Sequence, residues 1–410
     1  MRKKVCIGDL GTIVTGNTPP RNRPELYGNH TPFIKATDIS ESEKYTYNPE
    51  ECYSEEGYNK YIKSLIPKGS TCVVTIGSIG KKMTMAHCDL FINQAMNAII
   101  PNACFDSEYV YYAVKNVLGN IKTLDSGTAS GRENVSKSAF SKMEIWVEEE
   151  LPIQQRIATI LSRYDSLIEN YQKQIKLLEE SAQRLHKEWF IDLRFPGHEN
   201  TKIVDGVPEG WEKICIDSLV GKLESGSRPK GGIDKSIKDG VASVGAENVI
   251  GLGQYNFSSE KLVSYDFYNN AKKGRIENKD ILIYKDGAYI GRTSLFQDNF
   301  PHKEAMINEH VFLLHTKKEV NQYFLFFTLY QKVYFEKMQK LNKNAAQPGL
   351  NQNAIKSLKL LMPNEKLIVR FDEIISPMMK VLFDLANQIR HLTEARDRLL
   401  PKLMSGEIEV

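Results

Sequence analysis

The chain contains an internal repeat, because its opening segment recurs about 210 residues later. The segment KKVCIGDLGTIVTGNTPP, Lys3–Pro20, is matched by KICIDSLVGKLESGSRPK, Lys213–Lys230. The paired positions are Lys4, Cys6, Ile7, Leu10, Gly16 and Pro19 with Lys213, Cys215, Ile216, Leu219, Gly226 and Pro229. Solenoid repeats are far shorter than this, so the spacing indicates a duplicated domain.

Three further pairs of segments follow in the same order along the chain. IPKGSTCVVTIGSIGKK, Ile66–Lys82, matches IENKDILIYKDGAYIGR, Ile276–Arg292. Asn93 in FINQAMNAIIP matches Asn308 in MINEHVFLLHT. GTASGRENVSKSAFSKMEIWV has a looser match in NAAQPGLNQNAIKSLKLLMP, which is also small and amide-rich before an apolar strand. Four pairs in one order predict two domains of similar fold.

The composition is that of an ordinary globular protein with two or three domains. The chain has 410 residues, of which 41% are apolar and 26% charged. Asp9 and several glycines interrupt the opening apolar run, which is untypical of a signal peptide. The most apolar later run, YFLFFTLY, is too short to span a membrane. We therefore expect a cytoplasmic protein.

The cysteines and histidines form none of the usual metal-binding patterns. The six cysteines are scattered without a CxxC pair, so we expect free thiols rather than a zinc site or a disulfide framework. The histidines include no HExxH motif, and the spaced His302, His310 and His315 have no cysteine close by in the sequence. We expect no metal and no cofactor.

Each copy of the repeat ends in a long helical pattern. In the first copy, apolar residues alternate at spacings of four and three, which is a heptad seam. Its positions are Ile157, Leu161, Tyr164, Ile168, Tyr171, Ile175, Leu178, Ala182, Leu185 and Trp189. Pro152 stands near the expected start of this helix, and RFPG at Arg194–Gly197 ends the pattern.

The second copy ends in a similar but less regular seam. Its positions are Ile368, Phe371, Ile375, Met378, Leu382, Leu385, Ile389, Leu392, Leu399 and Leu403. Arg396 occupies one seam position. Pro377 removes a backbone donor, so we expect a kink or a restart of the helix near Ser376.

Two long seams of similar length favour pairing of the two helices with each other. The alternative is that each helix packs on its own globular domain, but a helix of about 39 residues, about 58 Å long, exceeds the width of such a domain. An antiparallel pair would close a chain that runs domain, helix, domain, helix. The predicted fold class is α+β, with two similar globular domains separated by two long antiparallel helices that form a coiled-coil spacer with pseudo-twofold symmetry.

Together these features resemble the specificity subunits of type I restriction-modification systems. The resemblance covers nearly the whole chain and is carried by the two helical segments, by GVPEGWEKI at Gly206–Ile214, and by the DGAYIGR and NAAQPGLNQ loops. The loop sequences of the first domain, TIGSIGKK and GTASGRENVS, differ from those usual in the family. The resemblance implies target-recognition domains at residues 1–150 and 196–362 and spacer helices at 151–195 and 363–410, the latter with a C-terminal tail.

The same resemblance implies what the protein binds. The family reads double-stranded DNA and binds methyltransferase subunits alongside, with restriction (helicase-nuclease) subunits joined through the complex. Because the chain presents nearly the same surface twice, we expect two methyltransferase subunits for each chain. Two DNA readers held apart by helices should recognise a bipartite target with an unread spacer.

The repeated loops are rich in the residue types that read DNA. Arginine distinguishes guanine and asparagine or glutamine distinguishes adenine, while phosphates accept bonds from Lys, Arg, Ser and Thr. In the first domain the predicted DNA-binding residues are Arg21, Arg23, Lys35, Thr37, Ser78, Lys81, Lys82, Asn93, Gln94, Ser130, Arg132 and Asn134. In the second they are Ser227, Arg228, Lys230, Lys285, Tyr289, Arg292, Asn308, His310, Gln347 and Asn351. The alternative for each is a solvated loop residue, and we expect Gly77, Gly80, Gly287 and Gly291 to serve tight turns.

The sequence contains no catalytic motif that we can recognise. GSIGKK does not complete the GxxxxGK[ST] phosphate loop, and there is no NPPY or DPPY tetrapeptide of amino-methyltransferases. The net charge of +3 fits a reader whose partners supply much of the phosphate binding, but it fits equally a protein that never meets nucleic acid. We expect a non-catalytic DNA-reading subunit. The alternatives are a coiled-coil scaffold with protein-binding domains and a hydrolase whose site the spacing does not show.

Overall fold

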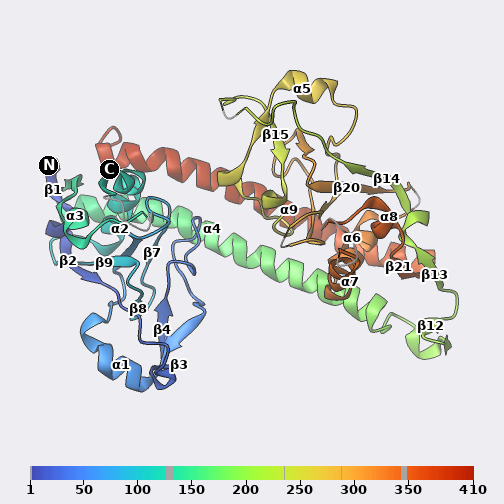
Figure 1. The fold of residues 1–410 in the computed structure, drawn as a ribbon, viewed down its shortest axis with the longest axis horizontal. Helices are drawn as coiled ribbons and strands as arrows, with labels where there is room; N and C mark the ends of the chain where they lie inside the picture. Colours follow the sequence, from blue (N-terminus) through green and yellow to red (C-terminus); the bar gives the residue numbers. More distant parts are fainter. Residues whose placement is uncertain (1, 126–132, 235, 288, 319, 343–348) are drawn as a thin grey trace. The chain divides into compact units, whose positions relative to one another are not determined.

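The computed structural model describes residues 2–125, 133–234, 236–287, 289–318, 320–342 and 349–410 (Figure 1). The chain divides into two compact units, one comprising Met1–Glu169 with His391–Val410 and the other Asn170–Arg390. Both divisions fall inside long helices. Each unit therefore contains one globular domain together with part of both helices.

The first unit is built around two four-stranded sheets, with the orders β2-β9-β6-β7 and β3-β5-β4-β8. In the second of these, β4 runs parallel to β8 and antiparallel to β5. A further antiparallel pair joins β1 to β10. The strands are β1 Arg2–Cys6, β2 Gly11–Thr15, β3 Tyr27–Gly28, β4 Thr31–Ile34, β5 Glu51–Tyr53, β6 Thr71–Val74, β7 Met83–Met85, β8 Phe91–Ile92, β9 Met96–Pro101 and β10 Glu144–Glu148. The short helices are α1 Glu55–Tyr61, α2 Ser107–Asn116 and α3 Lys137–Lys142.

The second unit contains a four-stranded sheet of order β14-β20-β17-β18 and a three-stranded sheet of order β16-β15-β19. Two antiparallel pairs, β13 with β21 and β11 with β12, complete its strands. The strands are β11 Ile203–Val204, β12 Val207–Pro208, β13 Glu212–Cys215, β14 Val220–Ser225, β15 Val241–Val244, β16 Leu262–Val263, β17 Ile281–Tyr284, β18 Thr293–Leu295, β19 Ala305–Ile307, β20 Val311–Thr316 and β21 Lys359–Met362. The short helices are α5 Tyr265–Asn270, α6 Gln322–Tyr330, α7 Lys332–Asn342 and α8 Gln352–Lys356.

The two domains share one topology, which confirms the duplication. The antiparallel order β2-β9-β6-β7 corresponds strand for strand to β14-β20-β17-β18. The parallel pair β4 and β8, with antiparallel β5 beside it, corresponds to the parallel pair β15 and β19 with antiparallel β16. The closing pair of β1 and β10 corresponds to β13 and β21. The α+β fold class with two similar domains is therefore confirmed.

One short helix in each domain lies in the core. The helix α2 is capped by Asp106, whose carboxylate accepts the N–H of Tyr109, and α6 is capped by Asn321, whose side chain accepts the N–H of Phe324. These caps satisfy backbone donors that the first helical turn leaves unpaired. The apolar run YFLFFTLY lies in α6 and is buried up to Leu329. No helix in the described part of the chain has both the length and the apolar character to cross a membrane.

Two long helices, α4 at Leu151–His186 and α9 at Glu365–Ser405, pair within each unit. In the first unit, Ile157 near the start of α4 and Leu403 near the end of α9 belong to one apolar cluster with the domain core. In the second unit, Ile175 and Leu382 both lie beside Gly253. Each unit thus pairs an end of one helix with the opposite end of the other, which is the antiparallel arrangement.

The far end of α4 packs into the core of the second domain. Trp189, in the π-helical turn Lys187–Ile191 that follows α4, lies 6.2 Å from the ring of Phe371 in α9. His186 is fully buried, with its Nε2 3.1 Å from the hydroxyl of Thr328. Burial lowers the pKa of His186 to about 3, so this imidazole is neutral at physiological pH.

The predicted seam positions lie on α4, its π-helical turn and α9, and every one is buried or half-buried. The helix α9 continues without a break through Pro377, so the restart expected near Ser376 does not occur. The helix α4 begins at Leu151, with Pro152 in its first turn, where a missing backbone donor costs nothing. All six cysteines are free, as expected.

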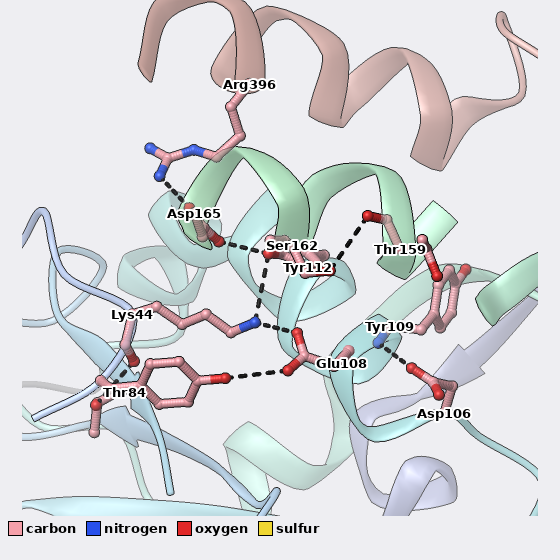
Figure 2. Close-up of polar contacts among 11 residues, drawn as sticks. Lys44, Thr84, Asp106, Glu108, Tyr109, Tyr112, Thr159, Ser162, Asp165 and Arg396 are labelled. Atoms are coloured by element: carbon pink, nitrogen blue, oxygen red, sulfur yellow. Dashed lines mark hydrogen bonds and ion pairs between the residues drawn. The ribbon is translucent and has the colours of Figure 1, made fainter. Parts of the chain in front are cut away.

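A buried polar network lies where α9 meets the first domain (Figure 2). Arg396 donates to Asp165 of α4 at 2.6 Å, and the hydroxyl of Tyr112 in α2 donates to the other oxygen of Asp165 at 2.5 Å. Lys44 pairs with Glu108 and lies 3.5 Å from the Tyr112 hydroxyl. The arginine that interrupts the apolar seam is therefore matched by a carboxylate on the facing helix.

Candidate nucleic-acid interface

Four loops of the first domain meet at one end of its two sheets. The N–H of Asn17 donates to the carbonyl of Ile92, and the N–H of Asn93 donates to the carbonyl of Ile34, both at 3.0 Å. These bonds join the loops that follow β2, β4 and β8. The loop after β6 reaches the same place, because the N–H of Thr75 donates to the loop between β8 and β9. We call this the loop edge of the first domain.

A repeated glycine holds the loop edge together in both domains. Gly16 lies against the carbonyl oxygens of residues 92 and 93, so a Cβ there would overlap them. Gly226 lies in the same way against the carbonyl oxygens of residues 307 and 308. The pairing of these two glycines in the sequence repeat therefore reflects a close approach of two backbones that only glycine permits.

Three of the predicted cations of the first domain are held by carboxylates. Arg21 donates twice to Glu51, at 2.5 and 3.1 Å, and the ammonium of Lys35 lies 3.5 Å from the same carboxylate. Arg23 donates to Glu25 at 2.6 Å. The hydrogen bond from Arg21 lowers the pKa of Glu51, so this carboxylate is charged at neutral pH. Such exposed pairs are weak because water screens them, and a DNA phosphate can compete for the cations.

The other predicted residues of the first domain differ in exposure. Thr37, Ser78, Lys81 and Gln94 are exposed, whereas Lys82, Asn93 and Asn134 are half-buried. Ser130 and Arg132 lie outside the described residues. The positive φ angles of Gly77 and Gly80 agree with the expected tight turns beside Ser78.

The second domain brings its candidates together at the equivalent strand ends. The ammonium of Lys285 donates to the carbonyl of Glu309 at 2.7 Å, and the carboxylate of Glu309 lies 3.2 Å from Nε of Arg228. Nδ1 of His310 lies 2.8 Å from Asp286. These residues follow β14, β17 and β19, which correspond to β2, β6 and β8. The second domain therefore has a loop edge of the same construction.

Two predicted residues of the second domain have local structural roles. Asn308 is only 5% exposed, and its side-chain oxygen accepts the N–H of His310. Asn351 caps α8 by accepting the N–H of Ala354 at 2.8 Å. Asn308 therefore shapes the loop that presents His310.

The remaining candidates of the second domain lie on neighbouring loops. The guanidinium of Arg292 stacks 4.0 Å above the ring of Tyr289, which is 55% exposed. An exposed aromatic and arginine pair offers a flat surface on which a base or a sugar can pack. Ser227 is half-buried and Lys230 exposed, beside Arg228, and Gln347 lies outside the described residues.

The structure adds a pair of contacts that the sequence did not suggest. In the first domain, the hydroxyl of Thr18 donates to Oε1 of Gln94, and in the second domain Arg228 pairs with Glu309. Thr18 stands two residues after Gly16 and Arg228 two residues after Gly226, so the two pairs join equivalent loops. One domain thus presents a neutral pair and the other a charged pair at the same place. Thr18 and Glu309 were missed because each partner is distant in sequence.

A comparison with protein families identifies this architecture. The family model described as the type I restriction modification DNA specificity domain matches residues 2–180 and 208–394, which is most of the chain. The chain belongs to this family. The two matched segments coincide with the two copies of the repeat, each taken with the following helix.

Relatives within the specificity-domain family support the assignment. The type I restriction enzyme MjaIX specificity subunit of Methanocaldococcus jannaschii is 28% identical, over 98% of this chain and 93% of the relative. The MjaVIII specificity subunit of the same organism is 23% identical, over 75% of this chain and 72% of the relative. The crystal structure of the S subunit of a type I restriction-modification system from M. genitalium shares the fold, with a TM-score of 0.60, 17% identity, and coverage of 98% and 96% of the two chains.

Proposed function

We propose that this chain is the non-catalytic specificity subunit of a type I restriction-modification system, which acts in the cytoplasm and reads a bipartite DNA target. One observation carries the proposal: a loop edge with cations and amides occurs once in each of two repeated domains. Residues 1–150 and 196–362 would each read one half of the target. The scaffold alternative is not favoured, because the chain belongs to a DNA specificity family.

The contacts within each loop edge suggest a division of labour. Glu309 binds Nε of Arg228, which leaves the outer edge of the guanidinium for the two acceptors of guanine. In the first domain, Thr18 binds Oε1 of Gln94 and so fixes the plane of an amide suited to adenine. The exposed lysines, such as Lys81 and Lys230, would contact phosphates.

A test of base reading is to replace Arg228 with alanine. We expect the preference at one position of the target half read by the second domain to weaken by about 1–3 kcal/mol, since a bidentate contact to one base is lost. Systematic binding measurements on DNA with each base varied would show this. Arg228→Lys keeps the charge without the fork and should also lose the preference.

The exposed Arg194 provides a control with the same change in charge. Arg194→Ala should leave the preference at every position unchanged. Equal loss of affinity for all sequences in Arg228→Ala would assign Arg228 to a phosphate instead of a base.

The helices also offer a surface for the methyltransferase and restriction subunits. Leu177 on α4 is 62% exposed, and Val369 and Val381 on α9 are 50% and 48% exposed. In the first unit Leu167 of α4 is exposed as well. Exposed apolar side chains that lie together in a patch mark protein interfaces. The seam residue Trp189 is buried in the second unit and so is not part of such a surface.

We predict that each chain binds two methyltransferase subunits, because the fold presents two equivalent units. Native mass spectrometry of the purified complex should give two methyltransferases for one copy of this chain. Leu177→Glu should reduce the occupancy, since a charge would enter the apolar interface, whereas Lys173→Glu on the same helix should have a smaller effect. A stable complex with a single methyltransferase would contradict the symmetry argument.

A further inference from the structure

A groove of about 430 Å³ runs beside β2 of the first domain. It is lined by residues of β2, of α1 with the turn after it, and of the start of α3. Three of the lining residues are lysines, namely Lys60, Lys63 and Lys137, and all three are exposed. Lys60 and Lys63 lie in one segment and Lys137 more than 70 residues later, so the sequence did not single them out as a group.

The positive charge of this groove is only partly offset within the described residues, where Lys60 adds to the effect of Arg23 in lowering the pKa of the Glu25 carboxyl. No carboxylate lines the groove, and no ion pair with a carboxylate involves Lys60, Lys63 or Lys137 in the described part of the chain. The cations of the loop edge differ, since Arg21 and Lys35 are both held by Glu51. The groove therefore concentrates three unpaired positive charges, which suits an anion rather than a base edge.

The strand β2 lies at the edge of its sheet and also lines the groove. Within the described residues it pairs with β9 on one side only, and an edge strand leaves alternate N–H groups without a partner strand. Backbone N–H groups and lysines are the two kinds of donor that proteins use for DNA phosphates. Asn17 lines the groove and also bonds to Ile92 at the loop edge, so the groove leads directly to the reading loops.

We propose that this groove binds the backbone phosphates of the DNA that flanks the first half of the target. The inference rests on the proposed DNA-reading function and adds a site of sequence-independent DNA binding to it. The second domain lacks the full set: counting from the equivalent helix caps Ser54 and Ser264, Asn270 stands in the place of Lys60. This phosphate-binding site is therefore present in the first domain only, and it acts on the DNA beside the first half of the target.

The test replaces all three lysines with glutamine in the full chain, purified with the methyltransferase subunits of its system. Affinity for a duplex containing the target is measured at several salt concentrations. Each lost phosphate contact reduces the slope of log K against log salt by about 0.9, so we expect a reduction approaching about 2.7. The methylated sequence should stay the same, because no base contact is removed.

Two control variants separate phosphate binding from other effects. The triple lysine-to-arginine variant keeps the charge and should keep the slope. Glutamine at Lys332, Lys380 and Lys402, which are exposed on helices and paired with carboxylates, makes the same change in net charge and should also keep it. Thermal unfolding checks that all variants are folded.

The outcomes distinguish this inference from the proposed function. If the unchanged complex binds its target but the glutamine variant keeps the full salt slope, the groove does not contact DNA and the inference is wrong. A loss of slope in the arginine variant as well would overturn the charge argument. If the unchanged complex bound no DNA at any salt concentration, the proposed function would fail, and this inference with it.

Discussion

Replacing Asp165 with leucine is expected to destabilise the protein by about 3–5 kcal/mol, because it leaves the buried Arg396 without its partner on α4. Burial alone would raise the pKa of Asp165, but Lys115 and Arg396 lower it below its ordinary value, so the carboxylate is charged at neutral pH. The change also removes the acceptor of the Tyr112 hydroxyl. The Tyr112 hydroxyl and Nη1 of Arg396 would then lose their acceptor (Figure 2), while Nε of Arg396 still donates to the half-exposed Asp397 at 2.9 Å.

The double variant Asp165→Leu with Arg396→Met tests whether the ion pair itself stabilises the fold or whether only an unpaired charge destabilises it. Removing both charges leaves an apolar contact between α4 and α9, and replacement of a buried pair in this way is often neutral or stabilising. We therefore expect the double variant to regain most of the lost stability. Urea unfolding of the single and double variants measures the free energy of unfolding and the coupling between the two positions.

The exposed pair of Lys176 and Glu180 on α4 is the matched control. Glu180→Leu should change the free energy of unfolding by less than about 1 kcal/mol, since exposed pairs contribute little. Equal effects of Asp165→Leu and Glu180→Leu would show that the buried network adds no stability.

Exchanging residues 1–150 for the corresponding part of a relative is expected to replace one half of the methylated sequence and leave the other half unchanged. The fold supports this exchange, because β1 pairs with β10 from Arg2 opposite Glu148 to Cys6 opposite Glu144. The two ends of the domain therefore lie side by side, and its only covalent link to the rest of the chain is at the start of α4, although it also packs against α4 and the end of α9. Methylome sequencing of cells that carry the variant and its methyltransferase measures the outcome.

The choice of the relative matters for this exchange. The incoming domain must supply a hydrogen-bond donor in the place of Tyr112, because Asp165 remains on the retained helix. A variant that changes neither half, or both halves, while remaining active would contradict the two-reader hypothesis. The reciprocal exchange of residues 196–362, which the pair of β13 and β21 closes in the same way, should change only the other half.

The sequence predicted the repeat, the fold class and the two long helices because each depends on a pattern within short segments. The pairing of Gly16 with Gly226 marked the same backbone junction in both domains, and the seams marked the buried faces of α4 and α9. The predicted restart of the helix near Ser376 does not occur, because α9 is continuous through Pro377. The nearby residues Ile375 and Met379 are buried. Burial of the flanking residues compensates for one missing hydrogen bond.

The candidate site was only partly accessible from the sequence. Residue types indicated which loops carry cations and amides, but not which carboxylate orients each one. Glu51 lies 30 positions from Arg21, and Gln94 lies 76 positions from Thr18. Contacts at such separations depend on how β2, β4 and β8 are ordered in their sheets, and no local periodicity records that order.

The amino-acid sequence by itself determined the duplication, the heptad faces and the loops rich in polar side chains, since these are properties of neighbouring residues. Only the tertiary structure decided which parts share a core. The start of α4 and the end of α9 pack into the core of the first domain. Arg396 binds Asp165, which is 231 positions away in the sequence. The groove of Lys60, Lys63 and Lys137 likewise exists only after folding. The physical reason is that burial and charge pairing act through space, so their partners are fixed by the path of the whole chain.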